Sequence, residues 1–175
     1  MLRFYITVCI GLIYSVDVFS QSSNDYWKDV EILTWADFAG MPDSQSPYAA
    51  NLTTGIRQEY SVDEAGMLVL NSLNIYPSFY PKLSWYKKNQ VTDALLMHER
   101  VHFKITAIHA VLLKQLTSTY KFTANSRNEL DQLYSDVEKK RQFMQTMFDE
   151  CTAHGLNINE AKVWEDKVNQ LLAKY

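Results

Sequence analysis

The sequence predicts an α+β fold, with a small antiparallel sheet in the N-terminal half followed by a helical half. Three observations lead to this prediction. Between residues 52 and 62 apolar and polar side chains alternate, as in a half-buried strand. From about residue 90 onward apolar residues recur three or four positions apart, as in amphipathic helices. The first of these helices contains the sequence H-E-x-x-H, which gives the helical half a candidate site.

Residues 1–20 have the features of a secretory signal peptide, which we expect to be cleaved. A basic start at Arg3 precedes an apolar run from Tyr5 to Val16, which is too short to span a bilayer comfortably. We therefore expect a secreted or periplasmic protein without stable membrane insertion, in which residues 21–175 form a single domain.

The composition narrows the class of protein. A formal net charge of −3 argues against a nucleic-acid-binding protein, which would need a basic face. Cys151 is the only cysteine after the signal peptide, so no disulfide within the mature chain is expected. The sequence leaves the oligomeric state open.

The N-terminal sheet is expected to be a β-hairpin. Residues 52–62 form its first strand, Asp-Glu-Ala-Gly at 63–66 forms the turn, and residues 67–76 return antiparallel. The apolar segment near Ile32 is expected to join this sheet.

The first and last helices have clear start signals. The first is expected over residues 90–116, with Asn89 or Thr92 as its N-cap. The last is expected to start at the cap Asn157 and to continue through Trp164.

The middle helix is expected over residues 126–154. The spacing of Ser126 and Glu129 is that of a capping box, and Gly155 is a stop signal. An apolar stripe continues from this start towards His154, so His154 is expected to face the first helix. The stripe consists of Leu130, Leu133, Val137, Met144, Met147 and Cys151.

The H-E-x-x-H sequence consists of His98, Glu99 and His102, set in an apolar stretch. Residues four apart lie on one face of a helix, so both imidazoles can bind one ion. The glutamate lies beside that ion, where it can act as a general base on a zinc-bound water. The pattern therefore predicts a zinc site and hydrolytic chemistry.

Catalytic zinc usually has three protein ligands, so one more is needed. His109 is a poor candidate, because it lies about 10 Å beyond His102 along the same helix. His154 is our candidate for the third ligand, and Glu150, four residues earlier, is its rival. Asp149 points away from His154 on a continuous helix and is expected to support a ligand rather than to be one.

Several of these motifs occur together in one known family. The chain resembles the bacterial "domain of unknown function 922" family, which is regarded as a group of secreted zinc-dependent proteases related to the zincin metallopeptidases. The matching segments are Leu33–Gly40, Ser84–Trp85, Leu96–Phe103, the D-x-x-T-x-H-G pattern at Asp149–Gly155, and Trp164.

The resemblance implies a zincin-like metallopeptidase fold and favours His154 over Glu150, because the family pattern has a histidine there. The chain departs from the family pattern at Arg100, where the family commonly has glutamine.

Taken together, these features predict a zinc-dependent metallopeptidase. His98, His102 and His154 would bind Zn²⁺, Glu99 would be the catalytic base, and the partner would be a peptide or protein substrate. The rival interpretation is a non-catalytic protein in which zinc stabilises the packing of two helices.

Overall fold

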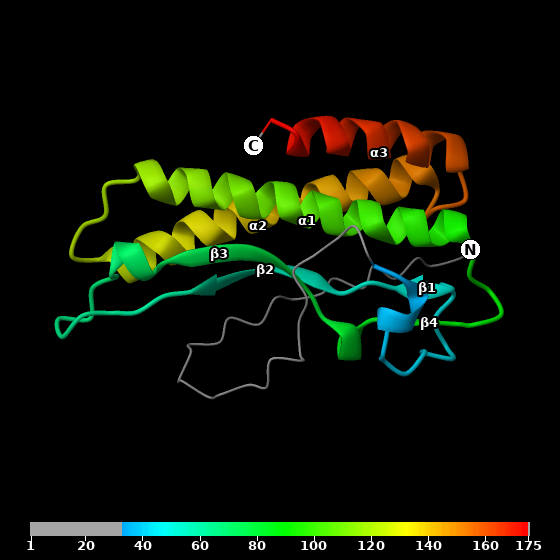
Figure 1. Cartoon of the computed structure of the whole chain (residues 1–175), viewed down its shortest axis with the longest axis horizontal. Coiled ribbons are helices and arrows are strands. Elements are labelled where there is room, and N and C mark those ends of the chain that lie inside the picture. The colour runs from blue at the N-terminus through cyan, green and yellow to red at the C-terminus, as the bar shows by residue number, and fades with distance from the viewer. Residues whose placement is uncertain (1–32, 175) are drawn as a thin grey trace, which may run out of the picture.

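The computed structural model describes residues 33–174, and its α+β architecture confirms the predicted fold class (Figure 1). The predicted signal peptide, residues 1–20, lies outside the described residues. Within residues 33–174, none of the helices has the length and apolarity needed to cross a membrane.

The predicted hairpin is present, with its return strand placed later than expected. Strand β2 (Thr54–Glu59) pairs antiparallel with β3 (Asn74–Phe79), with Thr54 opposite Phe79. The return strand does not start at residue 67, because Leu70–Ser72 forms a 3-10 turn first. Pro77 lies inside β3. It is tolerated there because β3 pairs on one side only within the described part of the chain.

A second pair of short strands extends this region. Strand β1 (Ala50–Asn51) pairs antiparallel with β4 (Trp85–Tyr86). Ile32 lies outside the described residues, but the segment after it is not a strand. It forms a 3-10 helix at Trp35–Asp37, because the Asp37 carboxylate accepts hydrogen bonds from the backbone and hydroxyl of Thr34.

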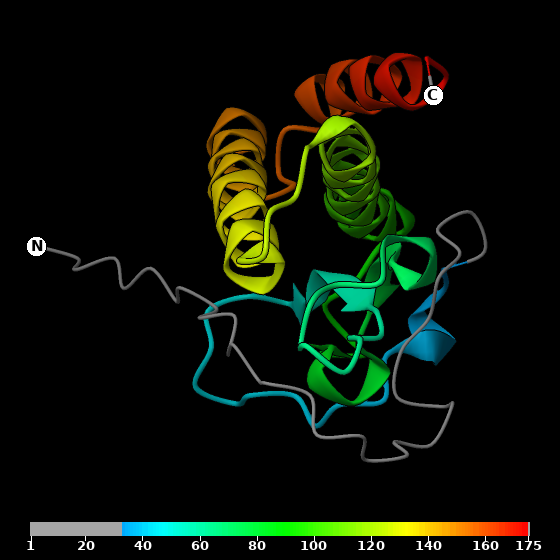
Figure 2. The same ribbon diagram turned by 90° about the vertical axis from the view of Figure 1, so that its left-hand side faces the viewer.

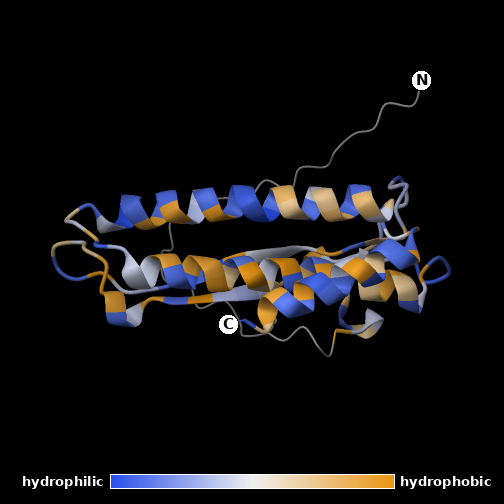
Figure 3. Cartoon of the chain, turned by 90° about the horizontal axis from the view of Figure 1, so that it is seen from above, coloured by the Kyte–Doolittle hydropathy of each residue, from blue (hydrophilic) through white to orange (hydrophobic). Residues whose placement is uncertain are grey.

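The central helix is α1 (Asp93–Thr119), which begins where Thr92 caps the backbone N–H of Leu95. It packs against β2 and β3 on one side and against α2 (Ser126–Thr152) and α3 (Ile158–Leu172) on the others (Figures 1 and 2). Hydrophobic colour is accordingly denser on α1 than on α2 (Figure 3). As predicted, Asn157 caps α3.

The core is formed where the other elements meet α1. Each of three buried clusters includes residues of this helix, which explains its apolar composition. Their α1 members are Val101, Ile105 and Ile108 in the first, Leu96 and Phe103 in the second, and Ala110 and Leu113 in the third.

The start of α2 differs from the predicted capping box. Asn125 occupies the N-cap position. The hydroxyl of Ser126 instead accepts a hydrogen bond from the backbone of Leu68. The Glu129 carboxylate reaches back to the backbone and hydroxyl of Thr123. The helix start is therefore fixed by contacts to preceding segments rather than by the reciprocal pair.

The end of α2 also differs, and this affects the site. The helix was expected to reach residue 154 but ends at Thr152. Ala153, His154 and Gly155 all have positive φ, of 49°, 54° and 84°. The backbone N–H of His154 donates to the carbonyl of Asp149 at 2.8 Å, which closes the helix. The inward stripe therefore does not continue to His154.

The buried face of α2 near its end is rotated from the predicted stripe. Phe148 and Thr152 are fully buried, whereas Met147 and Cys151 are exposed. Two polar residues of α2, Gln145 and Asp149, are therefore turned towards α1.

Candidate metal centre

His98 and His102 lie one turn apart on α1, and both side chains are largely buried. Their Nε2 atoms are 3.1 Å apart. A largely buried pair of imidazoles needs a polar partner, because burial without one costs free energy. The H-E-x-x-H spacing therefore brings two imidazole nitrogens together, as predicted.

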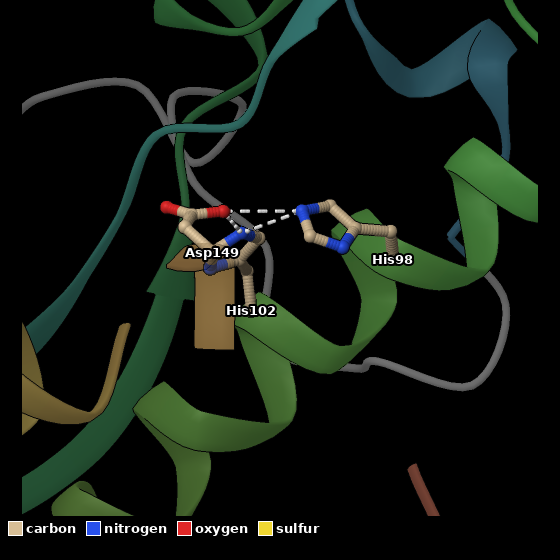
Figure 4. Close-up of side chains that lie close together, drawn as sticks. All are labelled: His98, His102 and Asp149. Carbon is tan, nitrogen blue, oxygen red and sulfur yellow. Dashed lines mark hydrogen bonds and ion pairs between the residues drawn. The ribbon is translucent and has the colours of Figure 1, made fainter. Parts of the chain in front are cut away.

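The partner comes from α2. The Asp149 carboxylate places Oδ1 3.2 Å from Nε2 of His98 and 2.9 Å from Nε2 of His102 (Figure 4). Within residues 33–174, His98, His102 and Asp149 form the group that could hold a metal ion. Each offers one possible ligand atom, and these atoms lie within 4.8 Å of one another.

The geometry of the group fits a small divalent ion. A metal bonded to nitrogen and oxygen ligands at about 2.0–2.1 Å in tetrahedral geometry holds those atoms about 3.4 Å apart. The three separations in the structure, 2.9, 3.1 and 3.2 Å, are close to this value. Two imidazoles and a carboxylate are also common zinc ligands. His98, His102 and Asp149 can therefore hold a metal ion.

The far side of each imidazole also has a polar neighbour. Nδ1 of His98 lies 3.5 Å from the hydroxyl of Thr152, which donates its own proton to the carbonyl of Phe148. Nδ1 of His102 is hydrogen-bonded to the amide oxygen of Gln145. Both neighbours can accept a hydrogen bond from Nδ1–H, and in that tautomer the Nε2 lone pairs are free for a metal.

Packing fixes the orientation of the rings. Phe148 stacks on His98 with ring centroids 4.4 Å apart and meets His102 at 4.9 Å and a steep angle. Gly155 also lies close to His98. A Cβ there would lie 3.2 Å from Cγ of His98 and from Cδ1 of Leu95. Only glycine tolerates both this close approach and its φ of 84° without strain.

The electrostatics of the metal-free group depend on Asp149. Burial lowers the pKa of His98 to about 4, against the effect of its hydrogen bond with Asp149. Burial also opposes protonation of His102, but hydrogen bonding to Asp149 and its negative charge raise the pKa of His102 above its ordinary value. Burial would raise the pKa of Asp149, but the two histidines outweigh it and hold this pKa well below its usual range. At neutral pH Asp149 is therefore an anion facing His102.

Glu99 lies on the same turn of α1 and is 6% exposed. Burial raises the pKa of its carboxyl to about 7, although the nearby charge of His102 opposes the rise and that of Asp149 adds to it. A carboxylate with a pKa near neutrality, next to a metal-binding group, is suited to general-base chemistry.

His154 lies beside the group rather than within it. Its Nδ1 is 3.8 Å from Oδ1 of Asp149, its side chain is half exposed, and its ring packs against Tyr48 at 5.4 Å. Its assignment as third ligand stays a prediction. Of the other residues weighed, Glu150 is exposed. His109 is buried, with Nδ1 2.8 Å from the carbonyl oxygen of Ile105.

Asp149 was expected to support a ligand, but its carboxylate contacts both histidines directly. A signal for this was present. Gln145, Asp149 and Thr152 are polar residues spaced four and three apart, so they share one face of α2, and all three contact the histidines.

In comparisons with known proteins, no protein-family model, curated protein or solved structure matches the chain.

Proposed function

We propose that this chain is a zinc-dependent peptidase in which His98, His102 and Asp149 hold the ion and Glu99 is the general base. The observation that supports the proposal most strongly is the convergence of three ligand atoms beside a buried carboxylate. His154 is the competing third ligand, since its Nδ1 lies 3.8 Å from Oδ1 of Asp149. Variants of Asp149 and of His154 distinguish the two candidates.

The residues of the chain have separate roles in the proposed reaction. A bound zinc ion would supply Lewis-acid chemistry, polarising a peptide carbonyl and acidifying a water molecule. Glu99 would take a proton from the attacking water and deliver it to the leaving amine. Phe148 would keep the imidazoles oriented and exclude solvent from one side of the site.

The sheet supports an extended peptide as the substrate. Extended peptides often bind to proteins by adding a strand to a sheet, and the described residues contain two strand pairs, β1–β4 and β2–β3. Thr54, at the start of β2, bonds to Thr106, one turn beyond His102 on α1. We propose that an extended peptide substrate lies along this part of the sheet, near the metal centre.

The family and the location are part of the same proposal. The motif set supports membership of the "domain of unknown function 922" family, and the signal-like residues 1–20 support a secreted or periplasmic location. N-terminal sequencing of the exported protein tests the location. A mature chain starting near residue 21 is expected, and retention of residues 1–20 would contradict it.

One observation favours a second function, a non-catalytic zinc-stabilised protein. The three possible ligands come from two helices, so an ion bound there would link α1 to α2 and stabilise the fold. The two functions differ in the role of Glu99, which a purely structural site does not need.

The deciding experiment combines zinc content with peptide hydrolysis for Glu99→Gln. This variant should retain zinc and lose about 10²–10⁴-fold in hydrolysis, because it keeps the size of the side chain but removes the base. Glu64→Gln is the matched control in the exposed turn at 63–66 and should keep both properties. Wild type that binds zinc but cleaves no member of a peptide library would instead support the structural function.

A further inference from the structure

A buried polar network extends from the metal centre towards the sheet. Its centre is the hydroxyl of Thr106, a fully buried residue one turn after His102. This hydroxyl lies 2.9 Å from that of Thr54 on β2, 3.3 Å from the amide nitrogen of Gln145 and 3.4 Å from Nη1 of Arg141. One side chain of α1 is thus bonded to both α2 and the sheet.

The guanidinium of Arg141, which contacts Thr106, is held in place by Glu138. Arg141 is largely buried, and two of its nitrogens donate to the two carboxylate oxygens of Glu138 one turn earlier. A bidentate pair holds the plane of the guanidinium, and a buried arginine needs such a partner because it stays charged. The remaining nitrogen is thereby directed at Thr106.

The orientation of the Gln145 amide follows from its neighbours. Its nitrogen donates to the backbone carbonyl of His102 at 2.9 Å, and a carbonyl can only accept. The amide oxygen must therefore be the atom that faces Nδ1 of His102. Because this oxygen can only accept, Nδ1 must carry a proton, so Nε2, which faces Asp149, is the ring nitrogen that can bind an ion.

We propose that Gln145 and Thr106 are the positioning residues of the metal centre. Gln145 fixes the tautomer and ring orientation of His102, and Thr106 holds Gln145 in place and ties this ligand to β2. Neither residue is a ligand of the ion. The inference rests on the proposed function only in taking the group as a metal site, since its main readout is zinc binding rather than hydrolysis.

The test measures zinc affinity by competition with a chelator, using zinc ion alone as the probe. Gln145→Leu should lower the affinity about 10–100-fold, the usual cost of removing a hydrogen-bond partner of a ligating histidine. Gln145→Glu should recover part of this loss, because its carboxylate still accepts a hydrogen bond from Nδ1 but cannot donate to the carbonyl of His102. Gln132→Leu is the matched control: Gln132 is exposed on α2 and bonds Asp136 away from the site.

A second measurement, the unfolding midpoint of the metal-free protein, distinguishes a merely structural role of Gln145. If the role is only structural, Gln145→Leu should lower this midpoint but leave the zinc affinity of the folded protein unchanged. That result would overturn the proposal. If Gln145→Leu does not fold, Thr106→Val and Thr106→Ser replace it. The valine should weaken zinc binding and the serine should not, and equal affinities for the two would overturn the proposal.

The proposed function can fail separately. Wild type that binds zinc without hydrolysis, with the Gln145→Leu loss as expected, would refute the peptidase and support the positioning role. Wild type that binds no zinc would refute both.

Discussion

The identity of the third ligand is tested by pairing Asp149→Asn with His154→Ala. Asparagine keeps the shape of the side chain at Asp149 but removes the negative charge that faces both imidazoles. Oδ1 of Asp149 lies 3.2 and 2.9 Å from the two Nε2 atoms, whereas Nδ1 of His154 lies 3.8 Å from that oxygen. The structure therefore predicts a large effect for the first variant and a small one for the second.

The magnitude follows from the role of each side chain. Removing a group that only hydrogen-bonds to a ligand weakens metal binding about 10–100-fold. Loss of the charged ligand itself should exceed this, so Asp149→Asn should lose at least about 100-fold, or about 2.7 kcal/mol. His154→Ala should lose less than about tenfold, because its side chain is half exposed and outside the group.

Chelator competition at neutral pH measures both affinities, and circular dichroism checks that each variant is folded. The reverse order would refute the reasoning. If His154→Ala loses zinc and Asp149→Asn retains zinc, His154 is the third ligand and Asp149 only orients the side chain of His154.

Three further predictions concern stability. In the metal-free protein the pKa of Glu99 is raised from 4.5 to about 7, so the folded state favours the protonated carboxyl. The contribution of this carboxyl to the free energy of unfolding is therefore fully present below about pH 4.5 and is lost as the pH rises through 7. Glu99→Gln should therefore raise the free energy of unfolding by up to about 3 kcal/mol at about pH 8 and leave it unchanged at about pH 4. The same difference between variant and wild type at both pH values would count against this. Gly155→Ala places a Cβ 3.2 Å from His98 at a φ of 84°, so it should cost about 1–3 kcal/mol and weaken zinc binding, and a variant as stable as wild type would contradict this. Arg100→Met removes hydrogen bonds of 2.8 and 2.6 Å to the carbonyl of Leu33 and should cost about 1.5–3 kcal/mol in urea unfolding, whereas an unchanged midpoint would show that these bonds do not stabilise the fold.

The parts of the site that the sequence predicts well are local in the chain. His98, Glu99 and His102 share one turn, and helical geometry alone brings the two histidines together. The caps Thr92 and Asn157 act on backbone groups three residues away, so the sequence identifies both as candidate caps. Asn157 is correct, and Thr92 is the right one of the two candidates for the first helix, which begins at Asp93 rather than at about residue 90 and ends at Thr119 rather than at 116.

The third position of the group could not be predicted in the same way, because it depends on how α2 ends and packs. An apolar stripe continued along an ideal helix leads to His154. The chain leaves the helix at Ala153, and three consecutive residues with positive φ turn His154 to the surface. Asp149 is brought to the histidines by the packing of Phe148 against both rings, a contact between segments about fifty residues apart.

The sheet shows the same limit. The alternation over residues 52–62 predicts a strand and a hairpin, both of which are present. The register is set by the 3-10 turn at Leu70–Ser72 and by pairing across the hairpin, which the alternation does not reveal.

The most direct test of the central claim is a crystal structure of the zinc-loaded protein, with anomalous diffraction recorded at the zinc absorption edge. We expect one anomalous peak about 2.0–2.2 Å from Nε2 of His98, Nε2 of His102 and a carboxylate oxygen of Asp149. A zinc-loaded crystal with no peak at these three side chains, or with the ion held elsewhere, would contradict it.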